Sequence, residues 1–189
     1  MIKLDDQLKA AIVQMPVKEK DKLLLRLAAK DKKLVARLIF ELIEGSSTRD
    51  ERATTLKREI GEELLKIDKD TRTPGYLLLY LRHWNARITE HVQATKDKPG
   101  EVSLAVFMLA EAFRVHREML DSFSDRRSDT LAPYIVRRTK SLLSKAEKLH
   151  EDYFIEFRQD MKDLLRHIWG FRPTAQIAEA MQLPKNWLL

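Results

Sequence analysis

Five polar side chains follow one line along a helix predicted over residues 75–94. They combine phenols, an imidazole, a guanidinium and a carboxylate at steps of three and four residues: Tyr76, Tyr80, His83, Arg87 and Glu90. Such groups on one side of a helix can line a pocket, bind an anion or move protons. The same spacing is typical of a half-buried face whose polar tips form hydrogen bonds between helices. We treat this line, the polar stripe, as a candidate ligand or catalytic site beside that structural interpretation.

Two further histidines lie on predicted apolar faces. His116 falls on the apolar side of a helix predicted over 101–123, and His150 lies beside Tyr153 in a C-terminal apolar stripe. Either can be a ligand or a proton carrier, but a buried, hydrogen-bonded imidazole explains both. Glu147 and His150 have the Glu-x-x-His spacing of di-iron bundles, which need that motif twice, and it occurs once here. We predict no metal site and no cofactor.

Basic residues gather in two segments, one in the N-terminal part of the chain and one near its C-terminal third. A surface that combined both would follow a phosphate backbone. Few aromatic residues interleave with the basic ones, so base stacking is not indicated, and lysines also cover the solvent side of any amphipathic helix. The candidate nucleic-acid-binding residues are Lys18, Lys20, Lys22, Arg26, Lys30, Lys32, Lys33, Arg37, Arg137, Arg138 and Lys140.

No other segment carries a recognisable catalytic motif. The chain lacks a glycine-rich phosphate loop, a Gly-x-Ser-x-Gly elbow, a His-Glu-x-x-His pair and an EF-hand loop. Residues 174–183 look like the start of a helix-turn-helix, but Pro184 stands where the recognition helix must follow. These absences argue against an ordinary hydrolase or nucleotide enzyme, and we lean towards a non-catalytic protein.

The elements that position these residues are all predicted to be helices. The longest periodic stretch spans 131–168, where apolar residues recur at three- and four-residue steps. An unbroken helix of that length would extend about 57 Å, so other helices must pack along it unless it kinks near Glu151. The helices over 75–94 and 101–123 are apolar around most of their circumference. We predict that they form the central hairpin.

Three shorter amphipathic helices are predicted before Gly45, over residues 4–14, 16–29 and 32–44. Their apolar faces are expected to be buried. The residues concerned are Leu4, Leu8, Ala11, Ile12, Leu23, Leu24, Leu27, Ala28, Leu34, Val35, Leu38, Leu42 and Ile43.

Capping signals mark two more helices. Thr48 and Glu51 have the spacing of a capping box and predict a helix over 49–68. Its narrow apolar stripe consists of Ala53, Leu56, Ile60, Leu64 and Ile67. Pro173 predicts the start of a short C-terminal helix, and the apolar segment around Trp187 is expected to dock on the core, because leaving it in water forgoes several kcal/mol.

Composition limits the class of protein. The 189 residues are 44% hydrophobic and 34% charged, a balance typical of amphipathic helices and not of a disordered chain. Cysteine is absent, which excludes disulfides and thiolate chemistry. The N-terminus has no signal-peptide core, and no apolar run approaches the ~20 residues that span a bilayer. We expect a soluble, cytoplasmic protein without a membrane partner.

We therefore predict one all-α domain, residues 1–189, with about eight helices and one long C-terminal helix. The arrangement is either a bundle or a short, irregular HEAT-like array of helical hairpins. The predicted function is a helical interaction or scaffold module that binds a protein partner. Phe107 supports this slightly, because it projects from the polar side of its helix among Glu111, Arg114 and Glu118.

Two alternative functions stay open. The first is nucleic-acid binding through the basic hairpin over 18–37, for which the net charge of +6 leaves room. The second is a small-ligand binder or an enzyme that uses the polar stripe. A homodimer can coexist with either the protein-binding or the nucleic-acid-binding function, since an unusually long helix offers a self-association face.

Overall fold

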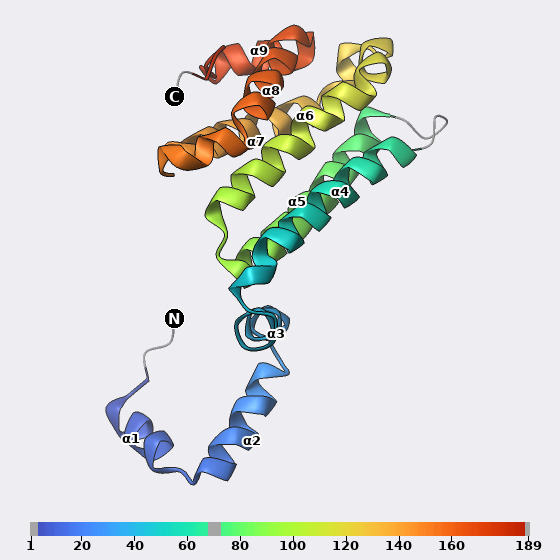
Figure 1. The fold of residues 1–189 in the computed structure, drawn as a ribbon. Helices are drawn as coiled ribbons and strands as arrows, with labels where there is room; N and C mark the ends of the chain where they lie inside the picture. The colour runs from blue at the N-terminus through green and yellow to red at the C-terminus, as the bar shows by residue number, and fades with distance from the viewer. Residues whose placement is uncertain (1–3, 68–72, 188–189) are drawn as a thin grey trace.

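The computed structural model describes residues 4–67 and 73–187, which contain helices and no strand (Figure 1). The predicted all-α fold is confirmed. The α-helices are α1 (Asp6–Gln14), α2 (Val17–Ala28), α3 (Lys32–Ile39), α4 (Arg49–Lys66), α5 (Pro74–Thr95), α6 (Lys98–Ser122), α7 (Leu131–Ala146), α8 (Arg158–Gly170) and α9 (Arg172–Ala180). Short helical turns are η1 (Phe40–Glu44), η2 (Ser46–Thr48), η4 (Asp125–Ser128) and η5 (Glu151–Glu156). Between the two architectures left open above, the chain forms a multi-helix bundle.

Helix α6 is the centre of the bundle, and α4, α5, α7 and α8 all pack against it. Its side chains Leu104, Met108, Leu109 and Phe113 are almost completely buried. The helix begins where the Asp97 carboxylate accepts a hydrogen bond from the backbone N–H of residue 100, at 2.9 Å. Helices α5 and α6 form the predicted central hairpin, so this prediction is confirmed.

Helix α4 lies beside α5 and α6 and buries the predicted stripe, with Ile60 and Leu64 fully enclosed. The helix ends at Lys66, and position 68 of the prediction lies outside the described residues. The capping box is wrong. Thr48 has helical backbone angles, its hydroxyl donates back to the Gly45 carbonyl at 3.0 Å, and its side chain accepts no hydrogen bond from the first turn of α4.

The unbroken helix over 131–168 is wrong, and the alternative, a break near Glu151, is confirmed, because η5 separates α7 from α8. The apolar period persists across the break, since both helices place their apolar faces on α6. Helix α6 is only about 38 Å long, so a straight 57 Å helix would extend beyond it. The break lets the chain use both sides of α6. It also turns Phe154 and Phe157 towards Trp187.

The C-terminal segment closes the bundle as predicted. Helix α9 packs on α7 and α8, and Thr174 donates from its buried hydroxyl to the carbonyl oxygen of Ile168 at 2.7 Å. Trp187 is only 6% exposed, and its ring lies 5.1 Å from that of Phe154 and 5.4 Å from that of Phe157, centroid to centroid. The docking of Trp187 on the core is confirmed.

Residues 4–44 form a different kind of structure, which we call the N-terminal arm; helices α4–α9 are the body. Helices α1 and α2 make an open hook at one end of the molecule, and α3 with η1 connects it to α5 of the body (Figure 1). Burial of the arm's apolar faces was predicted correctly for Ala28 and wrongly for most of the other residues. Five are half-buried, Ile12, Leu23, Leu34, Val35 and Leu38, and seven are exposed, Leu4, Leu8, Ala11, Leu24, Leu27, Leu42 and Ile43. Helix α1 has no buried residue, and α2 buries only Ala28. The reason is that no helix of the body lies opposite these faces.

The joint between arm and body is tight. The chain leaves η1 through Gly45, whose φ of +77° is a backbone conformation that suits glycine. Phe40 is buried at this joint, and the Arg52 guanidinium lies 5.8 Å from the centre of its ring. The same guanidinium pairs with Glu44 at 2.6 Å. The arm is thus anchored through α3 and residues 40–44, and α1 and α2 extend from there.

Candidate functional site

The polar stripe on α5 is divided between several environments. Tyr76, His83 and Glu90 are exposed, while the Arg87 guanidinium lies 3.6 Å from the Glu59 carboxylate of α4. The Tyr80 hydroxyl donates to the carboxylate of Glu63. Burial, together with this hydrogen bond, raises the pKa of Tyr80. Such a phenol holds its proton at neutral pH and is suited to joining α5 to α4.

Two members of the stripe line a cleft of about 470 Å³ between α3, α4 and α5. Arg87 and Glu90 share it with Glu51, Arg52 and Glu59 among others, whereas the remaining three stripe residues lie outside it. The structure therefore does not bring all five predicted side chains to one cavity. A ligand site on the stripe stays a prediction.

The two candidate histidines have opposite environments. His116 is 1% exposed within α6, where its φ of −112° and ψ of 16° depart from helical values. Its predicted burial is confirmed. His150 was predicted to lie on an apolar face, and this is wrong. It precedes η5 on the surface and faces Asp152, with Nδ1 3.0 Å from the carboxylate. Among residues 4–67 and 73–187, no three acidic or histidine side chains are grouped as metal ligands.

The two basic segments lie in different parts of the molecule. The candidate residues between 18 and 37 belong to α2, to α3 and, for Lys30, to the turn that joins them in the arm. The second segment belongs to α7 of the body (Figure 1). Arg138 is paired with Glu101 at 3.4 Å, and Lys140 donates to the Met181 carbonyl at 2.8 Å. The single basic surface that the alternative function invoked is thus divided, and its second half is partly neutralised.

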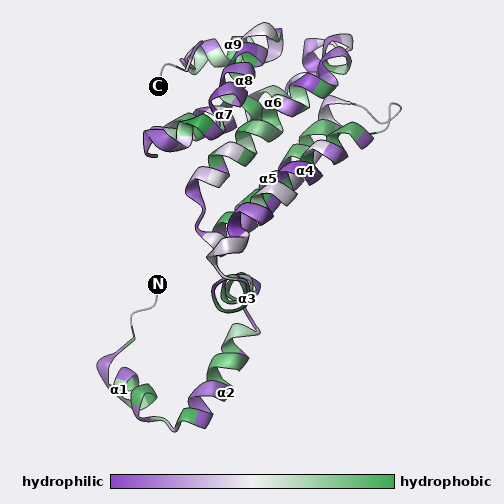
Figure 2. Cartoon of the chain, viewed as in Figure 1, coloured by the Kyte–Doolittle hydropathy of each residue, from purple (hydrophilic) through white to green (hydrophobic). Residues whose placement is uncertain are grey.

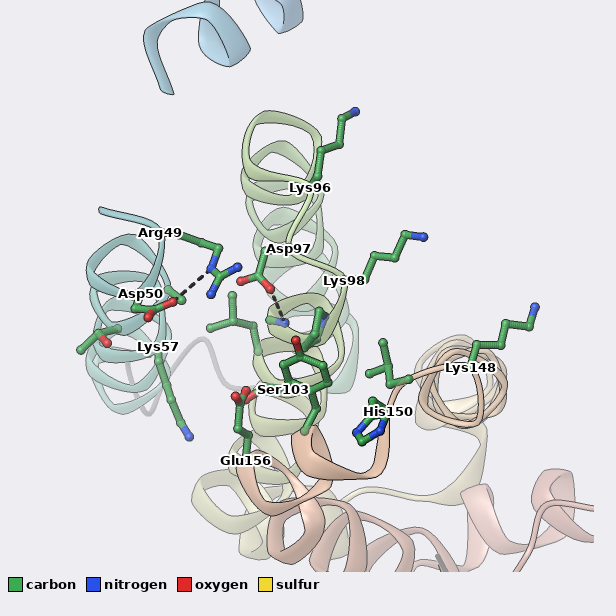
Figure 3. Close-up of a pocket in the computed structure, with 17 residues that line it drawn as sticks. Arg49, Asp50, Lys57, Lys96, Asp97, Lys98, Ser103, Lys148, His150 and Glu156 are labelled. Atoms are coloured by element: carbon green, nitrogen blue, oxygen red, sulfur yellow. Dashed lines mark hydrogen bonds and ion pairs between the residues drawn. The ribbon is translucent and has the colours of Figure 1, made fainter. Parts of the chain in front are cut away.

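A larger cleft, of about 750 Å³, lies where the N-terminal end of α4, the α5–α6 loop and η5 meet (Figure 3). Lys96, Lys98 and Lys148 stand on its rim and point outwards, while Asp97 and Glu156 face inwards. This mixture of charge does not select a ligand of either sign.

The pKa values of two carboxyl groups in this cleft are shifted in opposite directions. Burial raises the pKa of Glu156, and the nearby Asp97 raises it further. Burial also opposes ionisation of Asp97, but the His91 imidazole, 3.5 Å away, and the amide of residue 100 hold the Asp97 pKa below its usual range. Asp97 is therefore engaged in capping α6, which is a structural role.

The most unusual surface is the apolar face of the arm. Ten of the fifteen large apolar side chains that are exposed in the described chain belong to it: Leu4, Leu8, Val13, Val17, Leu24, Leu25, Leu27, Ile39, Leu42 and Ile43. Figure 2 shows apolar and polar residues mixed along α1 and α2 on the free hook. Summed over the start of the arm, α1, α2, the end of α3 and η1, these ten side chains expose on the order of 1,000 Å², whereas an ordinary contiguous apolar patch measures a few hundred Å².

Sequence reasoning missed this surface and pointed to a different one. Phe107 was expected to be an exposed aromatic on the polar side of its helix, and this is wrong. It is half-buried against α4, near Gly61, with the Lys57 ammonium 4.6 Å from its ring centre. The amphipathic pattern of the arm was visible, but nothing in it says that the body leaves the apolar faces uncovered.

In residues 4–67 and 73–187, no helix has both the length and the apolar character needed to cross a bilayer. The chain matches no protein-family model, no curated protein and no solved structure.

Proposed function

We propose that this chain is a non-catalytic helical protein that binds a protein partner through the apolar face of its N-terminal arm. The observation that carries the proposal is the exposure of ten large apolar side chains on a segment that projects from an otherwise well-packed body. An apolar patch of this kind marks an interaction site more often than an ordinary surface. Amphipathic helices bind partners by laying such faces into apolar grooves.

The energies are of the right order for specific binding. Burial of about 1,000 Å² of apolar surface corresponds to roughly 25 kcal/mol before opposing terms. Association and the ordering of side chains consume much of this amount, and the remainder determines the affinity. Helix α2 presents Leu24, Leu25 and Leu27 with 53 to 70% of each side chain exposed. These leucines are the expected centre of the contact.

Site-specific photo-crosslinking tests the proposal. A photoreactive residue replaces Leu24 on α2, and the control places the same residue at Leu79 on α5, where exposure is nearly equal at 62% against 60%. After irradiation in cell extract, adducts are separated and identified by mass spectrometry. We expect a discrete protein adduct from position 24 and none from position 79. No adduct, or the same adducts from both positions, contradicts the proposal.

Nucleic-acid binding is a second candidate, supported by the exposed cations of the arm. Lys18, Lys22, Lys30, Lys32 and Lys33 are exposed, and none forms an ion pair with another described residue. The alternative predicts binding to labelled single- or double-stranded nucleic acid that weakens steeply between about 50 and 200 mM salt. Reversal of the charges at Lys30, Lys32 and Lys33 would then abolish it, and binding that this variant retains would exclude the basic hairpin as the site.

A further inference from the structure

We propose that the occupant of the arm's apolar face is the arm of a second copy of this chain. This inference rests on the proposed function and names its partner. The chain would then be a homodimer joined through residues 4–44, with the two bodies outside the contact. Three features of the arm support a second copy: its apolar area, its balance of charge and its short, isolated helices.

The exposed area suits a dimer interface. A standard interface buries about 800 Å² on each partner, and homodimer interfaces are more apolar than transient ones. The ten exposed apolar side chains of the arm reach that size by themselves. In a two-fold symmetric dimer, one patch supplies both halves of the contact. The arm therefore carries enough apolar surface for the complete interface.

The charges of the arm favour self-pairing over a surface of one sign. Residues 4–44 contain nine basic and seven acidic side chains, a difference of only two. The signs alternate at the start of α2, in Lys18, Glu19, Lys20, Asp21 and Lys22. Two copies in antiparallel contact can place acids of one opposite bases of the other at the rim. Nucleic acid or an anionic bilayer would instead be matched by a face with few carboxylates.

The lengths of the arm helices also call for a partner. Helix α1 has 9 residues and α2 has 12, and helices this short are marginal in water without tertiary contacts. Both project from the body in the hook (Figure 1). Packing against the hook of a second copy supplies the missing helix–helix contacts. Association then stabilises the arm as well as joining the chains.

Light scattering during size exclusion, over a hundredfold range of concentration, tests the inference. One chain has a mass of 22.2 kDa, so we expect a mass near twice that value that falls on dilution. The variant Leu24→Asp with Leu27→Asp places two carboxylates in the apolar contact. Its expected dissociation constant is at least 100-fold higher, and its helix content by circular dichroism falls by no more than the share of α1 and α2, which depend on the contact. The control Leu65→Asp, on α4 and 61% exposed, is expected to stay dimeric.

A second measurement gives a result even if the protein with the two aspartates fails to fold. The chain has no cysteine, so Lys22→Cys on α2 accepts a single spin label, and Lys66→Cys at the end of α4 is its counterpart in the body. We expect a defined distance between copies for the arm label, lost on dilution with unlabelled protein. No dipolar coupling at position 22 in a protein of dimer mass overturns an interface through the arms.

The remaining outcomes separate this inference from the proposed function. A wild-type chain that stays at 22.2 kDa up to high concentration overturns the second copy as occupant. If position 24 still forms an adduct with a different protein, the proposed function stands without the dimer. A monomer that instead binds nucleic acid in a strongly salt-dependent manner overturns both.

Discussion

Removal of the Trp187 indole tests how the C-terminal segment holds the bundle together. In Trp187→Ala, contacts with Phe154 and Phe157 are lost at a site that is 6% exposed. A tryptophan buries about 200–250 Å², which corresponds to roughly 5–6 kcal/mol at 25 cal/mol per Å². The indole N–H has no hydrogen-bond partner among the described residues, and its removal returns about 1–3 kcal/mol. We expect a net loss of about 3 kcal/mol in the free energy of unfolding.

Urea unfolding followed by circular dichroism at 222 nm measures this loss without relying on tryptophan fluorescence. Trp187→Phe is the matched control, because it keeps an aromatic ring beside Phe154 and removes the unpaired N–H. We expect Trp187→Phe to lose about 1 kcal/mol or less. If Trp187→Ala loses under about 1 kcal/mol, or if both variants lose equally, the indole does not contribute through the packing described.

Three further predictions concern buried polar groups and glycines, each measured by urea unfolding. Thr174→Val removes a buried hydroxyl whose single O–H lies within hydrogen-bond distance of two carbonyl oxygens, those of Ile168 and Phe171, and we expect a loss of about 1–3 kcal/mol; no loss would mean that this hydrogen bond is not made. Gly61→Ala is expected to stabilise α4 by about 0.5–1 kcal/mol, since the nearest atom to an added Cβ is 3.7 Å away. Gly100→Ala is expected to destabilise the protein, since its Cβ would lie 2.0 Å from the Asp97 carboxylate. Changes of the same sign in the two variants would refute this contrast. Asp97→Asn keeps a capping side chain but removes the charge. Because the pKa of Asp97 is lowered in the folded protein, the variant's loss in free energy of unfolding should be largest at neutral pH and should shrink as the pH falls below about 4. A loss that is independent of pH contradicts this.

Local periodicity predicted the body well. The stripe from Leu56 to Ile67 on α4 and the apolar circumferences of α5 and α6 are visible in the sequence because each buried residue recurs at helical spacing. Docking of Trp187 was also predictable, since an apolar segment at the end of a chain gains free energy by covering the core. The helix stripes depend on nearby residues alone.

Features that depend on distant elements could not be predicted. The apolar period across α7 and α8 is the same for one long helix and for two helices that share α6. The choice depends on the length of α6 and on the pocket made by Phe154, Phe157 and Trp187. Because the helix breaks before η5, His150 lies on the surface and not on the apolar face that was predicted for it.

The arm is the clearest case of a feature that local sequence patterns could not predict. The pattern of α2 correctly indicates one apolar face, and an amphipathic helix predicts that some surface will cover that face. Nothing in the pattern says whether that surface belongs to the same chain. For α4 it does, with Ile60 fully enclosed, whereas Leu24 stays 60% exposed. The candidate functional surface is therefore the part of the chain where prediction of burial failed.

Hydrogen exchange of the arm at different protein concentrations tests the central claim most directly. Amides of α1 and α2 in a free hook are expected to open readily, because few buried contacts hold them. If the apolar face binds a second copy, exchange within residues 6–28 slows as the concentration rises, while exchange in α6 stays constant. Exchange in the arm that is fast and independent of concentration, in the absence of any other protein, would contradict a second copy as the occupant of the apolar face.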